Sequence, residues 1–319
     1  MSRFIILSLL ALAYQSFSMA EVTFQIFDKY VPNTSRLAGT EIVSISNGNI
    51  AGYAFTGEAF VIYNGTEYNN LQPMNDGNVI PYGGMSRGMV ALRGNSLLMQ
   101  ERMPYARTES KISQNNAWQS NSGWTGYRQI YSGYSSDSLL MTDFSDTGTS
   151  VGNFSGTSTG GRQQGFFFDI NGHRTEISYD YDTYLTGVFG NNVVGYAYGS
   201  SQMKGFIWQN GVFTDILVPG AYWTRADGIY ENLIVGSYGD NNGPSHGFLY
   251  DGTNYFTIDV PGATNTFFRD ISGTQAVGSY TTADGIYHGF VASSVPEASS
   301  LSLLALGGLA LALNKRRRA

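Results

Sequence analysis

The sequence predicts an all-β protein, a β-propeller of about six four-stranded blades closed by its N-terminal strand. Residues 247–250 (Gly-Phe-Leu-Tyr) match residues 205–208 (Gly-Phe-Ile-Trp) at an offset of 42 positions (247 − 205). The same offset relates residues 260–263 (Val-Pro-Gly-Ala) to the identical run that begins at Val218, and it relates two Val-Gly-Ser-Tyr runs. A unit of about 40 to 45 residues that holds four short strands is typical of a propeller blade.

Each repeat contains apolar runs that favour strands. Phe, Tyr, Ile, Val and Thr dominate these runs, and branched or aromatic side chains suit a pleated, half-buried surface. Asn210-Gly211 and Asp251-Gly252 separate such runs, and these pairs accept the positive φ angles of tight hairpin turns. One blade leaves both faces of its sheet uncovered, so the blades must stack around an axis. No Trp-Asp pair occurs in the sequence, which excludes the WD40 class.

The most regular repeats resemble a known family. Residues 257–264 (Thr-Ile-Asp-Val-Pro-Gly-Ala-Thr) are followed by Val-Gly-Ser-Tyr at 277–280 and by His-Gly-Phe at 288–290. This pattern is similar to the HAF-type extracellular repeat of bacterial exported proteins. The resemblance is close over residues 205–291 and weaker toward the N-terminus. It implies a propeller-like fold and export, and it implies no particular chemistry.

Residues 1–20 have the layout of a secretory signal peptide. Arg3 supplies the positive start, residues 4–13 the apolar stretch, and Ser18 and Ala20 the small residues of a cleavage site. The repeat domain is therefore expected to span residues 21–292, and the protein is expected to be exported.

The two ends of the repeat domain complement each other. Residues 23–27 (Thr-Phe-Gln-Ile-Phe) look like the strand at 255–258, whereas the last repeat ends after residues 289–291 without such a strand. We expect the N-terminal strand to complete the last blade, because a closed ring leaves no exposed sheet edge.

The blades are counted from a recurring turn that precedes a Val-Gly-x-Tyr strand. The turns fall near Gly48, Gly94, Gly148, Gly190, Asn232 and Gly273. Six blades is the best count, and five or seven remain alternatives, because Met99 replaces the glycine of this strand in the second unit.

Residues 102–137 differ from the repeats in composition. The stretch is rich in Ser, Asn and Tyr, and it contains Trp118, Trp124 and Tyr127. An insertion in a propeller usually forms a loop over one face, and aromatic rings suit a sugar or peptide surface. These three residues are therefore the candidate ligand surface, and the alternative is that they pack a divergent blade.

The composition excludes several classes of protein. The formal net charge is −6, which argues against a nucleic-acid partner, since phosphates require a basic footprint. The chain has no cysteine, so neither a disulfide framework nor a thiolate metal site is possible.

No metal or cofactor is predicted. Asp180 and Asp182 have the spacing of a metal-binding pair, but two residues on one face of an exposed strand have it too. Residues 240–243 (Asp-Asn-Asn-Gly) suit a turn better than a calcium loop, because no properly spaced Glu follows. His246 and His288 share one repeat position, and no acidic partner is expected to recur beside them.

The C-terminal tail, residues 293–319, differs from the repeats. Val295, Pro296, Glu297 and Ala298 precede an apolar run at 301–313, which predicts a short transmembrane helix. The terminal basic cluster consists of Lys315, Arg316, Arg317 and Arg318.

This order resembles the PEP-CTERM sorting signal of Gram-negative bacteria, although Ala298 stands where the family usually has proline. The resemblance implies an exosortase-type processing enzyme as partner, with transient anchoring in the inner membrane before delivery to the cell surface or the extracellular space.

Two functions compete. The favoured one is a non-enzymatic exported surface or matrix protein, associated with extracellular polysaccharide or biofilm as the sorting-signal family implies. The alternative is an exported propeller enzyme, a glycan hydrolase or lyase, with its site on the axis. No nucleophile-and-base pattern is evident, and the sequence cannot single out the two carboxylates that a glycosidase needs.

Overall fold

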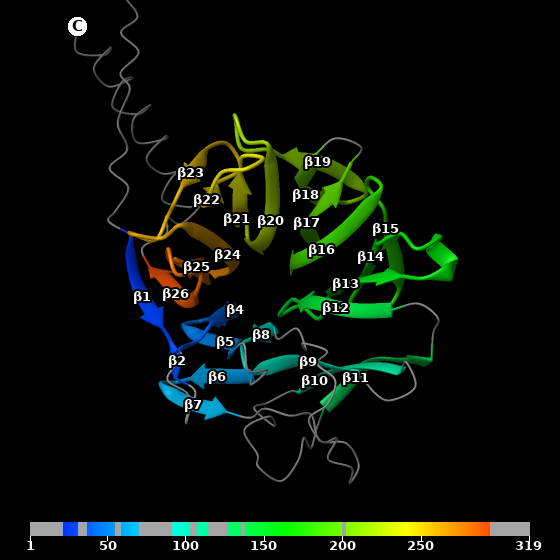
Figure 1. Cartoon of the computed structure of the whole chain (residues 1–319). Helices are drawn as coiled ribbons and strands as arrows, with labels where there is room; N and C mark the ends of the chain where they lie inside the picture. Colours follow the sequence, from blue (N-terminus) through cyan, green and yellow to red (C-terminus); the bar gives the residue numbers. More distant parts are fainter. Residues whose placement is uncertain are drawn as a thin grey trace, which may run out of the picture.

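The computed structural model describes residues 22–30, 37–54, 59–69, 91–102, 107–113, 127–134, 138–199 and 202–293. These residues form six four-stranded antiparallel sheets around a common axis (Figure 1), and one two-stranded sheet of β2 (Lys29–Tyr30) and β3 (Leu37–Ala38). The predicted all-β propeller is confirmed. The expected signal peptide and transmembrane helix lie outside the described residues, and within those residues no helix is long and apolar enough to cross a membrane.

Each sheet is one blade, and its strands follow one another from the axis outward. Blade 1 contains β4 (Thr40–Ser46), β5 (Asn49–Ala54), β6 (Ala59–Tyr63) and β7 (Thr66–Asn69). Blade 2 contains β8 (Ala91–Arg93), β9 (Ser96–Arg102), β10 (Arg107–Ser113) and β11 (Tyr127–Tyr134). Blade 3 contains β12 (Ser138–Phe144), β13 (Ser150–Ser155), β14 (Gln164–Phe168) and β15 (Arg174–Ile177).

Blades 4, 5 and 6 complete the ring. Blade 4 contains β16 (Asp182–Phe189), β17 (Asn192–Tyr198), β18 (Met203–Gln209) and β19 (Val212–Ile216). Blade 5 contains β20 (Trp223–Tyr230), β21 (Leu233–Gly239), β22 (Ser245–Tyr250) and β23 (Tyr255–Thr257). Blade 6 contains β24 (Asn265–Ser272), β25 (Gln275–Thr281), β26 (Tyr287–Ser293) and, as its outer strand, β1 (Thr23–Phe27).

The ring has two distinct faces. Each inner strand contacts the inner strand of the next blade, and β24 contacts β4 to complete the circle. The six predicted turns all join a first strand to a second strand. We call the face with these turns the hairpin face. The opposite face carries the loops from second to third strands and from blade to blade, and we call it the connector face.

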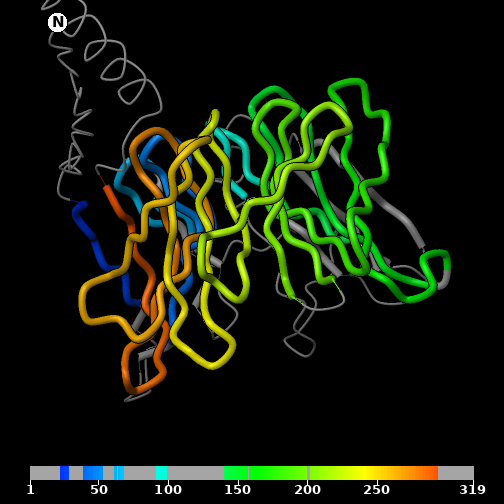
Figure 2. Tube along the Cα trace, turned by 90° about the horizontal axis from the view of Figure 1, so that it is seen from above, coloured from blue at the N-terminus to red at the C-terminus, as the bar shows by residue number. Residues whose placement is uncertain are grey.

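The N-terminal strand closes the ring, as predicted. β1 pairs antiparallel with β26 in a register that runs from Thr23 opposite Ser293 to Phe27 opposite Gly289. Blue β1 lies beside orange-red β26 in both views (Figure 1, Figure 2). The Phe24 ring packs edge-on against the fully buried Phe290, with centroids 5.7 Å apart. Blade 6 is thus assembled from both ends of the described chain.

The recurring Gly-Phe pair of the third strand joins neighbouring blades. The phenylalanines of this pair are all fully buried: Phe166, Phe206, Phe248 and Phe290. A Cβ on the glycine before Phe248 would lie 2.6 Å from the Phe268 ring on the inner strand of blade 6. Glycine is therefore required here because the next blade approaches the strand closely.

The glycine of the Val-Gly-x-Tyr strand has a different role. The inner strands β4, β12, β16, β20 and β24 each contain a register shift of the β-bulge type near their middle. A Cβ at Gly236 would lie 2.0 Å from the carbonyl oxygen of Arg225, and one at Gly278 would lie 1.9 Å from that of Phe267. The repeat glycine thus permits the bulge, and the bulge turns inner-strand side chains toward the axis.

Much of the unusual stretch 102–137 is not a loop. It supplies β10 and β11, the third and fourth strands of blade 2. Trp118 and Trp124 lie outside the described residues, and Tyr127 is the first residue of β11. Irregular composition in this region therefore coincides with antiparallel strand pairing that has one register shift, between Ser110 and Lys111.

Candidate site on the propeller axis

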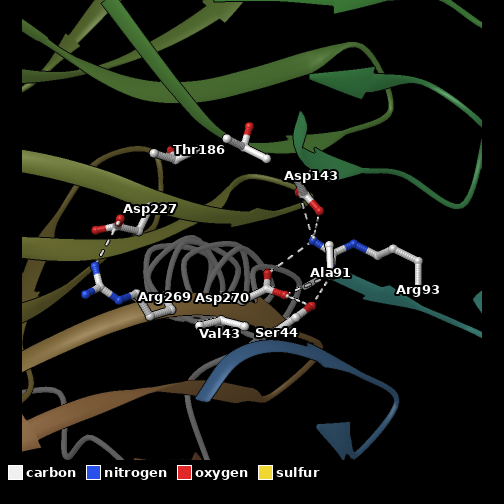
Figure 3. A pocket seen from close by; sticks show the side chains of 10 residues that line it. Val43, Ser44, Ala91, Arg93, Asp143, Thr186, Asp227, Arg269 and Asp270 are labelled. Carbon is white, nitrogen blue, oxygen red and sulfur yellow. Dashed lines mark hydrogen bonds and ion pairs between the residues drawn. The ribbon is translucent and has the colours of Figure 1, made fainter. Parts of the chain in front are cut away.

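The inner strands place a polar cluster where the axis passes through the ring. A cavity of about 20 Å³ lies there (Figure 3). The bulge residues of five inner strands, from blades 1, 3, 4, 5 and 6, line it: Val43, Thr142, Thr186, Asp227 and Arg269. Ser44, Asp143 and Asp270 follow the bulge residues of their strands, and Arg93 comes from the end of β8.

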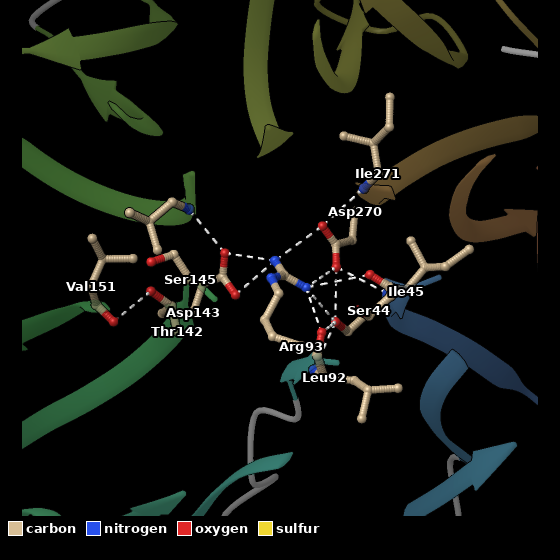
Figure 4. Close-up of polar contacts among 12 residues, drawn as sticks. Ser44, Ile45, Leu92, Arg93, Thr142, Asp143, Ser145, Val151, Asp270 and Ile271 are labelled. Atoms are coloured by element: carbon tan, nitrogen blue, oxygen red, sulfur yellow. Dashed lines mark hydrogen bonds and ion pairs between the residues drawn. The ribbon is translucent and has the colours of Figure 1, made fainter. Parts of the chain in front are cut away.

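Arg93 joins opposite sides of the ring. Its Nη1 donates to Asp270 Oδ2 on blade 6 at 2.8 Å, and its Nη2 donates to Asp143 Oδ2 on blade 3 at 2.9 Å (Figure 4). Nη1 also donates to Ser44 Oγ at 3.0 Å. Burial by itself would lower the pKa of Arg93, but the two carboxylates outweigh burial and raise it. The guanidinium is therefore charged and bound to three blades besides its own.

The two carboxylates beside Arg93 are not equivalent. Asp270 also accepts hydrogen bonds from Ser44 Oγ (2.8 Å) and from the backbone N–H groups of Ile45 (3.0 Å) and Ile271 (2.9 Å). Asp143 accepts from the Val188 N–H at 2.9 Å, and its Oδ1 lies 2.9 Å from Arg93 Nη2 as an ion-pair contact. Burial raises the pKa of Asp143 to about 7, although Arg93 acts in the opposite direction. Burial therefore favours the protonated form of Asp143.

A second ion-pair chain runs along the other side of the axis. Arg225 Nε donates to Asp227 Oδ1 at 2.6 Å, and Arg269 Nη1 lies 3.7 Å from the same oxygen. Arg269 Nη2 reaches Glu41 on blade 1 at 3.4 Å. Burial raises the pKa of Asp227, and Oδ2 of this residue is buried without a hydrogen-bond partner among the residues described. The chain links blades 5, 6 and 1.

The axial contacts follow the repeat. Asp270 accepts from Ile45 N–H of the next blade, and Asp143 accepts from Val188 N–H of the next blade at the same repeat position. In the same way Thr142 Oγ1 donates to the Leu185 carbonyl at 2.9 Å. Thr186 Oγ1 donates to the Ala226 carbonyl at 2.8 Å. These recurring bonds fix neighbouring inner strands to one another, which is a structural task.

The chemistry open to the axial cluster is limited by space and by charge. A cavity of about 20 Å³ has room for one water molecule and not for a sugar ring. A glycosidase needs two carboxyl groups on either side of a bound glycosidic bond, about 5 to 9.5 Å apart. Asp143 and Asp270 are instead bridged by one guanidinium. In the described part of the chain, no group of three or more His, Asp or Glu side chains is placed to hold a metal ion.

The expectation that no acidic partner recurs beside the repeat histidines is wrong. His246 Nδ1 lies 2.7 Å from Asp259 Oδ2, and His288 Nδ1 lies 2.7 Å from Asp28 Oδ1. Asp259 follows the outer strand of blade 5, and Asp28 follows β1, so both hold the same place in a blade. The partner of His288 was missed because it comes from the far end of the repeat domain.

The other acidic candidates lie in bends or at the start of a strand. Asp180 precedes β16 in a bend, where its side chain accepts a hydrogen bond from the Tyr181 N–H at 2.8 Å. Asp182 begins β16 and accepts from the Gln163 N–H at 2.8 Å. The idea that both lie on one exposed strand is therefore wrong. Residues 240–243 form the bend between β21 and β22, as the turn reading predicted.

Several sequence candidates lie outside the described residues. They are the cleavage residues Ser18 and Ala20 and the sorting-signal residues Val295, Pro296, Glu297, Ala298, Arg316, Arg317 and Arg318.

The axial residues themselves were missed in the sequence. One signal pointed to them: Thr142-Asp143 and Arg269-Asp270 hold the same position, a few residues before a first-to-second-strand turn.

No family model matches the sequence, and no curated protein matches it. Similar solved structures include the β-propeller domain of the Trilobed protease from Pyrococcus furiosus, with 8% identity, a TM-score of 0.47, and coverage of 80% of this chain and 93% of that one. The Trypanosoma rangeli sialidase has 10% identity, a TM-score of 0.46, and coverage of 85% and 57%. The six-bladed fungal lectin of Aleuria aurantia has 10% identity, a TM-score of 0.44, and coverage of 80% and 91%. At these identities the likeness concerns the fold alone.

Proposed function

We propose that the protein is an exported bacterial surface or matrix protein that binds extracellular polysaccharide without catalysing a reaction. Sorting through the C-terminal signal, with cleavage by an exosortase-type enzyme, belongs to the same proposal. The alternative is an exported propeller enzyme, a hydrolase or lyase that acts on glycans.

The observation that supports the non-enzymatic role is that the axial carboxylates form ion pairs with arginines. Asp143 and Asp270 share Arg93, and Asp227 is paired with Arg225. A catalytic carboxyl must face its substrate, whereas these groups face guanidinium groups in a space for one water. The axis is the natural pocket of a propeller, so its occupation by ion pairs weighs against the enzyme alternative.

One preparation of the purified protein separates the two functions. A glycan array measures binding, and a hydrolysis and elimination screen on the same polysaccharides measures product release. Retention on glycans with no product over a day of incubation is the expected result. Steady release of sugar products would overturn the proposal in favour of the enzyme.

The export and sorting steps have a separate test. Mass spectrometry of the protein from its native cells is expected to find an N-terminus near Glu21 and loss of the residues after about Pro296. Recovery of the full-length chain from the cytoplasm alone would contradict both steps.

A further inference from the structure

Four tyrosines and two arginines lie on the connector face, on blades 3, 4 and 5 and on the segment that joins blades 3 and 4. We call Tyr181, Tyr184, Tyr196 and Tyr198 with Arg162 and Arg225 the aromatic row. Tyr184 and Tyr196 stack face to face, with ring centroids 4.8 Å apart and planes 7° apart. Tyr198 lies 6.0 Å from each of them and stands nearly perpendicular to both, at 79° and 80°.

Strand pairing and the arginines extend the row in both directions. Tyr198 pairs across the strands with Asp182, which directly follows Tyr181. The guanidinium of Arg162, from the loop between β13 and β14, lies 4.3 Å over the Tyr181 ring. At the other end Arg225 on β20 lies 4.8 Å over the Tyr196 ring. The row therefore combines side chains from three blades, as a polymer-binding surface would.

The outer rings of the row face solvent. Tyr181 is 56% exposed and Tyr198 is 46% exposed, although large apolar rings are normally covered. Arg162 covers one side of Tyr181, and neither Tyr184 nor Tyr196 stacks flat on Tyr198. Each exposed ring thus offers a flat surface to a ligand, and the stacked pair Tyr184 and Tyr196 packs beside Tyr198.

The chemistry of the row identifies the ligand class. We propose that the aromatic row binds a neutral polysaccharide, with pyranose rings lying on Tyr181 and Tyr198; this rests on the proposed function and names its binding surface. A pyranose presents an apolar C–H face that suits the negative face of an aromatic ring. Phenol groups add neutral hydrogen bonds to sugar hydroxyls.

Electrostatics favour a neutral polymer over an acidic one. Arg225 is paired with Asp227 at 2.6 Å, so its charge is compensated. Asp180 and Asp182 flank Tyr181 in the chain, and the whole sequence has a net charge of −6. The row thus has two arginines, with Asp227 paired to one of them and Asp180 and Asp182 beside Tyr181 in the chain, and this balance of charge disfavours a polymer of uronic acids.

The test compares two double variants of the full chain by affinity electrophoresis in gels that contain dissolved polysaccharide. Tyr181→Ala with Tyr198→Ala removes the exposed rings of the row. Ile170→Ala with Val212→Ala is the matched control, because both residues are 64% exposed on the hairpin face, Ile170 in the turn between β14 and β15 and Val212 at the start of β19. Gels contain neutral glucans, galactomannan or xylan, or the acidic polymers alginate and hyaluronan. Thermal unfolding of all variants shows whether each remains folded.

We expect at least one neutral polymer to retard both the wild type and the control. The tyrosine variant should bind that polymer with an affinity at least about tenfold lower, at an unchanged melting temperature. Equal retardation of the tyrosine variant and the wild type would refute the aromatic row as the binding surface, and it would leave the proposed function unaffected. Stronger retardation by acidic polymers would overturn the neutral class. Absence of any retardation of the wild type would overturn the proposed function together with the row, and a protein partner would then be the better assignment.

Discussion

His288 and Asp28 lie 260 positions apart in the chain, and their Nδ1 and Oδ1 atoms are 2.7 Å apart. The same pair occurs within blade 5, where His246 meets Asp259 over a separation of only 13 positions. The His288 ring also stacks on Tyr280 at 4.9 Å. The closing strand therefore reproduces in blade 6 a contact that blade 5 makes within one segment, and β1 is a full member of the repeat.

The first prediction concerns this closure. Deletion of residues 21–27 should lower the melting temperature of the whole ring and promote association, because the exposed edge of β26 loses its partner. Each lost backbone hydrogen bond costs about 1 kcal/mol net. Differential scanning calorimetry and light scattering measure the two effects. Removal of residues 296–319 is the control, and a monomeric N-terminal deletion that melts like the intact chain would refute the closed ring.

The second prediction concerns Arg93. Arg93→Met should lower the free energy of unfolding by about 3–5 kcal/mol, because it leaves Asp143 and Asp270 buried without a counter-charge. Urea unfolding followed by tyrosine and tryptophan fluorescence measures the change. Arg174→Met is the control, since the Arg174–Glu176 ion pair is partly exposed and contributes little, while the Met side chain can keep the packing over Phe154 and Phe166. A loss of less than 1 kcal/mol for the axial variant would show that the cluster does not hold the blades together.

The third prediction concerns pH. Burial raises the pKa of Asp143 from 3.8 to about 7 in the folded state. A raised folded-state pKa stabilises the protein fully below pH 4, and this contribution is lost as the pH rises through 7. The slope from one such proton is at most about 1.4 kcal/mol per pH unit. Asp143→Asn cannot ionise, so its free energy of unfolding should fall less steeply than that of the wild type between pH 4 and 7. Parallel profiles for the two proteins would contradict the assignment.

The fourth prediction concerns the repeat glycine. Gly236→Ala places a Cβ 2.0 Å from the Arg225 carbonyl oxygen, so the bulge of β20 must rearrange. Overpacking of this kind costs typically about 1–3 kcal/mol. Gly243→Ala is the matched control, because its nearest contact is the Asp240 side chain at 3.2 Å. Chemical unfolding of both variants checks the difference, and equal stabilities would mean that the close approach is not what requires glycine.

The sequence predicted those features that recur along the chain. The strands, the six turns and the partnership of β1 with β26 all follow from a pattern that repeats at nearly constant spacing. Blade 2 departs most from the pattern, because Met99 stands where its second strand would carry the repeat glycine. The signal of a repeat comes from the recurrence of a few positions, so one replaced position weakens it.

The axial cluster could not be predicted in the same way. Arg93, Asp143 and Asp270 belong to three different blades and meet only because the ring brings blades 2, 3 and 6 to one axis. Each residue alone looks like a polar residue near a turn. The aromatic row likewise depends on which ends of neighbouring blades share a face. Contacts of this kind require the ring geometry, which the spacing of a repeat does not contain.

Closure of blade 6 also imposes an order on biosynthesis. β1 is synthesised before every other strand of the ring, and β26 is synthesised last. The two strands can therefore pair only after the other five blades have been synthesised. Until β26 is made, β1 has no partner strand in its own chain, and neighbouring unfinished chains can pair with it instead. The yield of closed rings should therefore depend on how many nascent chains share a compartment, even though the finished molecule is held together within a single polypeptide.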